Sequence, residues 1–455
     1  MSSATADSRL ASARVFLWRV LDLLRMPLLA MFAAFVLGAV VIWITSGSLV
    51  TVGEAYLGLV RGAFFKQRGL SESLVATIPY VMLSLALAVS FKTGLFNIGA
   101  EGQFYIGAIC AAWVGQLFTG IPAIIHLPLT LAAGALGGAL WAAVPGYLKA
   151  KTGAHEVIST MMMNYVAFRL SEYLISRPLR DKGAGLVQTP RVSPQAELWT
   201  LAAVPERLKD PLNALFVGLI FAFLTAVIVR EILKAPRWRE RIARDSQRRI
   251  TYIGFGLLVG AVVFVALPPL TRLWWPYQDP YNRLHIGLFM AILAAVGVWW
   301  LLWKTTIGFE LRTVGANPNA ARYAGMNITR NIVLAMAISG GLAGLAGTVE
   351  VLGVSICRCL PLFFSSGYGW DSIAIALVAK NDPFGILAAS FLFGAMRNGA
   401  DLMELMSGVS KYVISVIQGL MLLFVAAPAV VRWLFRIRAE RKVEEEAPVV
   451  RGWGG

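Results

Sequence analysis

The chain has 455 residues, of which 58% are hydrophobic and 15% are charged, and its mean hydropathy is +0.68. Soluble domains are about half apolar and about a quarter charged, so this composition excludes an ordinary soluble domain and indicates a membrane protein. The net charge of +16 does not indicate a nucleic-acid partner, because the basic residues are dispersed at the ends of apolar runs and form no stripe with aromatic residues.

Apolar runs of about 20 residues, the length needed to cross about 30 Å of hydrocarbon, recur along the chain. The first is too long for the apolar region of a secretory signal, and no small-residue cleavage motif follows it cleanly, so we expect it to remain as an anchor. The sequence therefore predicts an all-α polytopic membrane protein of about 12 transmembrane segments. Their ranges are 27–45, 74–91, 104–118, 127–148, 157–175, 212–233, 250–267, 284–303, 332–352, 384–396, 412–428 and a short, broken or partial span at 371–379.

The stretch 94–103 is a polar insert between two apolar runs and reads Gly-Leu-Phe-Asn-Ile-Gly-Ala-Glu-Gly-Gln. A charged side chain at the bilayer centre costs about 2.5 to 3.5 kcal/mol on insertion scales, so such residues mark a pathway or site. We expect Asn97, Glu101, Gln103 and Asp371 to line a translocation pathway. The alternative is that these groups cap broken helices and bond one another. Glu350 and Arg397 are further polar residues in or beside predicted spans.

Lys and Arg in the short loops predict the orientation of the chain. With twelve crossings, the basic clusters before the first span, after the fourth, eighth and last, and between the sixth and seventh all fall on one face. Both termini are therefore expected to be cytoplasmic. The segment 177–210 must lie outside although it carries six basic residues, because four acidic residues accompany them and the loop is long.

A second informative stretch follows the eighth span. Asn317 is a good N-cap, Pro318 suits the first turn, and Gly325 can end a helix in a left-handed cap. These signals predict a short cytoplasmic surface helix at 317–325. Such a helix is too short to be stable alone, so it needs a partner to lie against.

Enzymatic chemistry finds little support in the sequence. No lysine follows a glycine, so the Gly-Lys-Ser/Thr ending of a phosphate-binding loop is absent, and the three histidines lack metal-ligand spacing. We expect no cofactor, metal or catalytic residue. A disulfide between Cys357 and Cys359 is conceivable on the outer side, although their spacing strains such a bond, and the sequence assigns these cysteines no role.

Four motifs together give the chain a family resemblance. They are the stretch 94–103, the segment 311–326, the glycine-rich run 339–347 and the stretch 367–377. In this order they resemble the permease family of bacterial ABC importers, within it the nucleoside and simple-sugar branch, which is related to ribose and branched-chain amino-acid permeases. The resemblance covers most of residues 70–205 and 284–430.

The resemblance implies a multi-pass subunit of the bacterial inner membrane that performs no ATP hydrolysis itself. It implies four partners: a cytoplasmic ABC ATPase subunit, a second permease subunit in a heterodimer, an extracytoplasmic solute-binding protein and the lipid bilayer. The helix at 317–325 matches the position of the family's coupling helix. The residues expected to couple to the ATPase are Arg312, Asn317, Pro318, Ala320, Ala321, Arg322 and Gly325.

The chain departs from the family by an insertion of about 80 residues with two extra apolar helices. Without them, five spans remain on each side, and an odd number per half predicts two halves of inverted orientation whose broken helices meet near the bilayer midplane. The predicted parts are a cytoplasmic segment 1–26, a first transmembrane half 27–204, the inserted helical pair 205–283, a second half 284–431 and a cytoplasmic tail 432–455.

The expected solute is a nucleoside first, a simple sugar second and a branched-chain amino acid third. An ion-coupled secondary transporter is the competing function. It would explain Glu101 and the broken helices, but it leaves the helix at 317–325 without a task.

Overall fold

The computed structural model describes residues 28–118, 120–233 and 245–436, so the expected segment 1–26 and most of the tail 432–455 lie outside the described residues. Within these ranges the regular structure is helical, apart from isolated bridges between Gln188 and Pro361 and between Thr200 and His285. Seven described helices are long and apolar enough to cross a membrane by length and composition. The all-α polytopic prediction is confirmed, and the total of about 12 spans stays a prediction.

Every predicted span coincides with a helix. The first part of the chain forms helix Leu28–Ser46, α2 (Leu49–Val60), the π-helical turn η1 (Arg61–Phe65), α3 (Gly69–Lys92), α4 (Ala100–Leu117), α5 (Ala123–Thr152) and α6 (Glu156–Ser176). After a loop come η2 (Leu201–Ala203), α7 (Val204–Arg207), α8 (Pro211–Leu233) and α10 (Asp245–Leu273). The last part forms α11 (Gly287–Lys304), α12 (Thr306–Ala316), α13 (Pro318–Tyr323), α14 (Ile328–Val349), η3 (Glu350–Val354), α15 (Tyr368–Val378), α16 (Pro383–Ser407), α17 (Tyr412–Ala426) and α18 (Pro428–Leu434). The helix α2 had no counterpart among the predicted spans.

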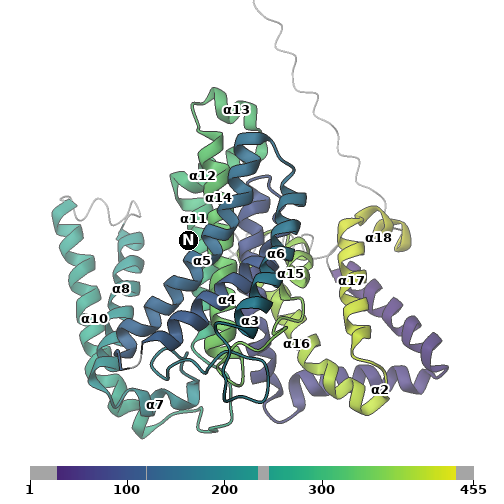
Figure 1. Cartoon of the computed structure of the whole chain (residues 1–455), viewed down its shortest axis with the longest axis horizontal. Coiled ribbons are helices and arrows are strands. Elements are labelled where there is room, and N and C mark those ends of the chain that lie inside the picture. Colours follow the sequence, from purple (N-terminus) through teal and green to yellow (C-terminus); the bar gives the residue numbers. More distant parts are fainter. Residues whose placement is uncertain (1–27, 119, 234–244, 437–455) are drawn as a thin grey trace, which may run out of the picture.

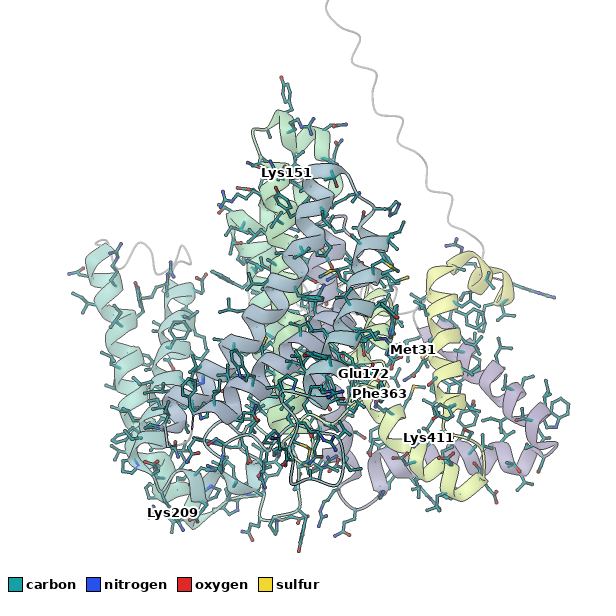
Figure 2. The ribbon with its side chains drawn as sticks, in the orientation of Figure 1. Met31, Lys151, Glu172, Lys209, Phe363 and Lys411 are labelled. Atoms are coloured by element: carbon teal, nitrogen blue, oxygen red, sulfur yellow. A yellow bond between two sulfur atoms is a disulfide. The ribbon has the colours of Figure 1, made fainter. Side chains whose placement is uncertain are left out.

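Figure 1 shows a bundle with α13 at one end and α7 at the opposite end, here called the α13 end and the α7 end. The same two ends can be located in Figure 2, where Lys151 lies toward the α13 end and Lys209 and Lys411 lie toward the α7 end. The centre of the bundle is α3, because 83% of its most apolar stretch is buried against α14, α15, α16 and α11. A helix that is apolar on all sides is stable in a protein core or as a membrane span, and α3 lies in the core of the bundle.

The helices α4, α5 and α14 approach each other through glycines. A Cβ on Gly344 of α14 would lie 2.3 Å from the carbonyl oxygen of Gly134 in α5, and a Cβ on Gly107 of α4 would lie 2.3 Å from the Cα of Gly344. Backbones in contact give close van der Waals packing, which replaces the hydrophobic drive that is missing between helices in lipid. The packing of these three helices thus depends on small residues at their contact.

We expect Gly344→Ala to destabilise the folded protein by about 1 to 3 kcal/mol, because the added methyl group forces α14 away from α5. The matched control is Gly341→Ala on the same helix, where the nearest atom to a new Cβ, the carbonyl oxygen of Ala135, is 3.6 Å away. Thermal unfolding of both variants in detergent measures the difference. Equal melting temperatures for the two variants would contradict the packing argument.

The inserted helices α8 and α10 pack against each other and stand to one side of the bundle (Figure 1). Only 17% and 11% of their most apolar stretches are buried, as expected for helices that face lipid. Near the α7 end the insertion is tied to the start of α3, because Arg68 binds Asp279 and Arg283 binds Glu72. The hydrogen bond from Arg68 holds the pKa of the Asp279 carboxyl below its usual value.

Candidate functional site

Helix α13 has the capping that the sequence predicts. The Asn317 side-chain oxygen accepts hydrogen bonds from the backbone N–H groups of Asn319 at 3.0 Å and Ala320 at 3.1 Å. At the other end Gly325 has φ +80°, and the Met326 N–H donates to the Ala321 carbonyl at 3.0 Å. This pairing satisfies the last carbonyls of the helix. Both caps satisfy backbone groups locally, so they help α13 hold its shape at the tip of the molecule.

Apart from the capping residues, the predicted coupling residues differ in exposure and position. Ala320 and Arg322 are exposed on α13, beside Tyr323, which is 97% exposed and was not among the predicted residues. Ala321 is fully buried, so it packs α13 against the rest of the chain and has no surface available for a partner protein. Arg312 lies on α12, where its Nε donates to the Leu302 carbonyl at 2.9 Å. It therefore fixes the corner between α11 and α12.

A backbone contact joins this region to the polar stretch 94–103. A Cβ on Gly315 in α12 would lie 2.4 Å from the carbonyl oxygen of Lys92 at the end of α3. A Cβ on Gly94, which has φ +74°, would lie 3.2 Å from the Cα of Gly315. The glycine at position 94 permits a left-handed turn and the one at 315 permits close approach. The backbone of α12 is thus in direct contact with the break between α3 and α4.

Two of the predicted pathway residues, Asn97 and Gln103, hold that break together. The Asn97 amide donates to Gln103 Oε1 at 3.0 Å and to the Ser339 hydroxyl of α14 at 2.9 Å, and Gln103 returns a hydrogen bond to Asn97 at 3.0 Å. Asn164 of α6 accepts from the Gly102 N–H at 2.8 Å and donates to the Ile98 carbonyl at 2.9 Å. All three amides are buried, and Asn97 and Asn164 accept from the backbone N–H groups of Gly99 and Gly102 at the start of α4.

Glu101 connects the two broken helices. Its carboxylate oxygens accept hydrogen bonds from the Ser365 hydroxyl and from the Gly369 N–H, each at 2.5 Å. A Cβ on Gly369 would lie 2.7 Å from the backbone nitrogen of Glu101, so the backbones of α15 and α4 are in contact here. Glu101 lies in the first turn of α4 and accepts from the first turn of α15. Two helix N-termini therefore stabilise one buried negative charge.

Asp371 belongs to a second network on the other side of α15. The Tyr80 hydroxyl donates to Asp371 Oδ2 at 2.7 Å and accepts from Arg397 at 2.9 Å. The Arg397 guanidinium lies 4.1 Å from the ring centroid of Tyr368. A tyrosine hydroxyl thus bridges an acid on α15 and a base on α16. Of the four predicted pathway residues, Asn97 and Gln103 form an amide pair at the α3–α4 break. Glu101 of α4 accepts from the first turn of α15, and Asp371 lies in that turn.

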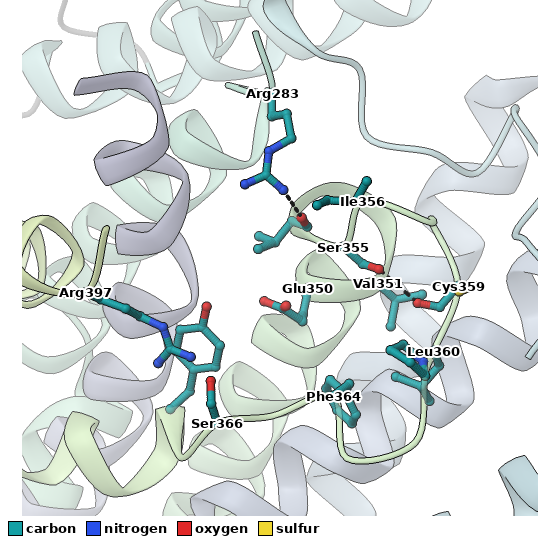
Figure 3. Close-up of a pocket in the computed structure, with 13 residues that line it drawn as sticks. Arg283, Glu350, Val351, Ser355, Ile356, Cys359, Leu360, Phe364, Ser366 and Arg397 are labelled. Carbon is teal, nitrogen blue, oxygen red and sulfur yellow. Dashed lines mark hydrogen bonds between the residues drawn. The ribbon is translucent and has the colours of Figure 1, made fainter. Parts of the chain in front are cut away.

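A cavity of about 290 Å³ lies next to this second network and is drawn in Figure 3. Polar and charged side chains reach it from five parts of the chain: the loop before α11, η3, the loop 355–367, α15 and α16. Sequence reasoning noted Glu350 and Arg397 as polar residues in or beside predicted spans but did not place them in the pathway. The sequence signal for both residues was a charged side chain in or beside an apolar run. The polar and aromatic residues of the lining are Arg283, Glu350, Ser355, Phe364, Ser366, Tyr368 and Arg397.

The loop that closes one side of the cavity is held by the segment that follows α6. Backbone hydrogen bonds link Thr189 to Leu360 at 3.0 Å and Val192 to Arg358 at 2.9 Å. Cys357 and Cys359 are joined by a disulfide, and Cys359 lines the cavity. The 355–367 loop is therefore a defined wall.

Comparisons with known proteins agree with this architecture. Residues 69–426 match the family described as branched-chain amino acid transport system, permease component. The chain is 34% identical over 411 residues to the guanosine ABC transporter permease protein of Bacillus subtilis, which covers 90% of this chain and 95% of the relative. It is 28% identical over 398 residues to the glucose ABC transporter permease protein of Haloferax volcanii (88% and 86%). It is 27% identical over 405 residues to the nucleoside ABC transporter permease protein of Lactococcus lactis (89% and 91%).

No solved structure matches the chain. The family match extends from the start of α3 into the last residue of α17, and so includes both broken helices, the cavity and α13. The chain belongs to the permease-component family of branched-chain amino-acid-type transport systems.

Proposed function

We propose that the chain is the membrane permease subunit of an ATP-driven ABC importer that moves a nucleoside into the cytoplasm. The observation that carries this proposal is α13, a capped helix with an exposed face whose neighbour α12 touches the α3–α4 break backbone to backbone. A rigid helix at the surface can convert closure of an ATPase subunit into movement of the spans. ATP hydrolysis then belongs to that separate subunit.

The proposal orients the molecule with its α13 end in the cytoplasm. Lys149 and Lys151 lie toward that end, in keeping with the excess of basic residues in cytoplasmic loops. The termini would then be cytoplasmic in a bacterial inner membrane, and the cavity wall at 355–367 would face a solute-binding protein. A second permease subunit, with which this chain forms a heterodimer, completes the pathway between two inverted halves.

Nucleoside is the favoured solute because relatives named for guanosine and nucleosides align with this chain along most of its length. A simple sugar is second, because a relative named for glucose also aligns over 88% of the chain. The polar stretches that carry the broken helices would serve any small polar solute. Secondary transport remains the competing function.

Reconstitution in lipid vesicles tests the proposal. The chain is assembled with its ATPase, second permease and binding protein, and uptake of labelled guanosine and glucose is measured with ATP and with a non-hydrolysable analogue. We expect uptake only with ATP and the complete complex. Uptake by this chain alone, driven by a proton or sodium gradient, would instead establish a secondary transporter.

A further inference from the structure

We propose that the 290 Å³ cavity is the solute site of this permease, and that Glu350 accepts a hydrogen bond from a hydroxyl or N–H group of a nucleoside. This inference rests on the proposed importer function and adds to it a location, a residue and a chemical class. A cavity of this size is at the lower end of the range for sites that hold one small molecule.

The first argument is an acceptor without a donor. Glu350 is 8% exposed, and within the described part of the chain no hydrogen bond reaches its buried Oε2 atom. Figure 3 shows its carboxylate directed toward the middle of the cavity. A buried carboxylate oxygen without a partner is costly, so its position calls for a donor that comes from outside the chain.

The second argument is that the neighbouring cations are already bound elsewhere. Arg283 binds Glu72 on α3 and donates to the Val354 carbonyl at 3.3 Å. Arg397 donates to Tyr80 and lies over the ring of Tyr368. Both guanidiniums border the cavity, yet their interactions hold them to its walls. The free acceptor therefore suits a hydroxyl or an N–H edge better than a second carboxylate.

The third argument is the aromatic wall. Tyr368 and Phe364 both line the cavity, and Phe364 is fixed by stacking on Phe104 at 5.3 Å between ring centroids and by contact with Tyr105 at 4.6 Å. Contact between a nucleobase and an aromatic side chain is worth about 1 to 3 kcal/mol. A solute with one flat ring and several hydroxyl or N–H donors satisfies both features, and a nucleoside is such a molecule.

Substitution of Glu350 tests the contact in the complete reconstituted complex. Glu350→Ala should lower guanosine uptake about 10- to 100-fold, the effect of losing a hydrogen bond to a charged group, and Glu350→Gln, which keeps one acceptor oxygen, should recover part of it. Because no hydrogen bond in the described part of the chain holds the buried Oε2 atom, Glu350→Gln, which keeps the shape of the side chain, should have the melting temperature of the wild type. A melting temperature that falls together with uptake would assign Glu350 a structural role and overturn the proposal.

A panel of analogues adds a readout that is specific for one solute group. Inosine, 1-methylguanosine, 2′-deoxyguanosine, 3′-deoxyguanosine and 5′-deoxyguanosine each lack one donor group of guanosine. The wild-type complex should transport one of them more slowly than guanosine, and Glu350→Ala should erase that preference. A uniform fall for every solute, or no change, would refute direct contact. Absence of ATP-driven uptake in the wild type would instead refute the importer function.

Thiol protection locates the site without touching Glu350. Ser366→Cys places a thiol in the cavity lining, whereas Phe363→Cys on the same loop lines a neighbouring hollow and is the matched control (Figure 2). Millimolar guanosine should slow modification of the thiol at 366 by a membrane-impermeant reagent and leave the thiol at 363 unaffected. Equal rates with and without guanosine at position 366 would place the solute elsewhere.

Discussion

Substitution of glutamate for Ala320 will abolish ATP-driven solute uptake while the protein still folds and inserts. Ala320 is exposed in the first turn of α13, where a negative charge is compatible with the helix dipole, so the helix itself should not be weakened. In the assembled importer the same charge would be buried at the ATPase contact without a partner. A penalty of about 2 to 5 kcal/mol corresponds to a loss of binding of roughly 30-fold or more.

The neighbouring alanine provides the matched control. Ala321 is fully buried against its own chain, so Ala321→Glu should unseat α13 and lower the melting temperature of the isolated subunit, whereas Ala320→Glu should leave it unchanged. Co-purification of the ATPase subunit, vesicle uptake and thermal unfolding distinguish the two variants. Normal recruitment and uptake with Ala320→Glu would remove α13 from the ATPase contact.

The local features of this fold could be predicted because their causes are local. Asn317 and Gly325 mark the ends of α13, and the hydrogen bonds that form these ends join residues at most five positions apart. The spans follow from the length of each apolar run. Sequence reasoning could not tell Ala320 from Ala321, because the difference between them depends on which side of α13 meets the rest of the chain.

The site depends on contacts between distant parts of the chain, and these left only partial signals. Glu101 was recognisable as a costly charge, but its partner Gly369 is 268 positions away, and nothing in either sequence neighbourhood specifies the pairing. Asn97 and Gln103 were expected to line a pathway, with mutual bonding as the alternative, and the structure pairs them with each other. The cavity could not be foreseen, because Glu350 and Arg397 become neighbours only when α14 and α16 pack around α3.

Glu101→Ala should be the most damaging single substitution between the two broken helices. It leaves the Ser365 hydroxyl and the Gly369 N–H without their acceptor in a buried region, and each unsatisfied group costs about 1 to 3 kcal/mol. It also removes the negative charge that the N-termini of α4 and α15 share. We expect a large fall in melting temperature in detergent and loss of vesicle uptake.

Glu101→Gln separates hydrogen bonding from charge at the same position. The glutamine oxygen can accept from the Gly369 N–H, while its NH₂ group donates to the Ser365 oxygen, because a serine hydroxyl can accept as well as donate. Both contacts survive, so this variant should retain most of the stability that Glu101→Ala loses. If glutamine proves as destabilising as alanine, the charge between the helix N-termini is the dominant contribution. If alanine is as stable as the wild type, Glu101 does not hold α4 and α15 together, and the junction must be maintained by the backbone contact at Gly369 alone.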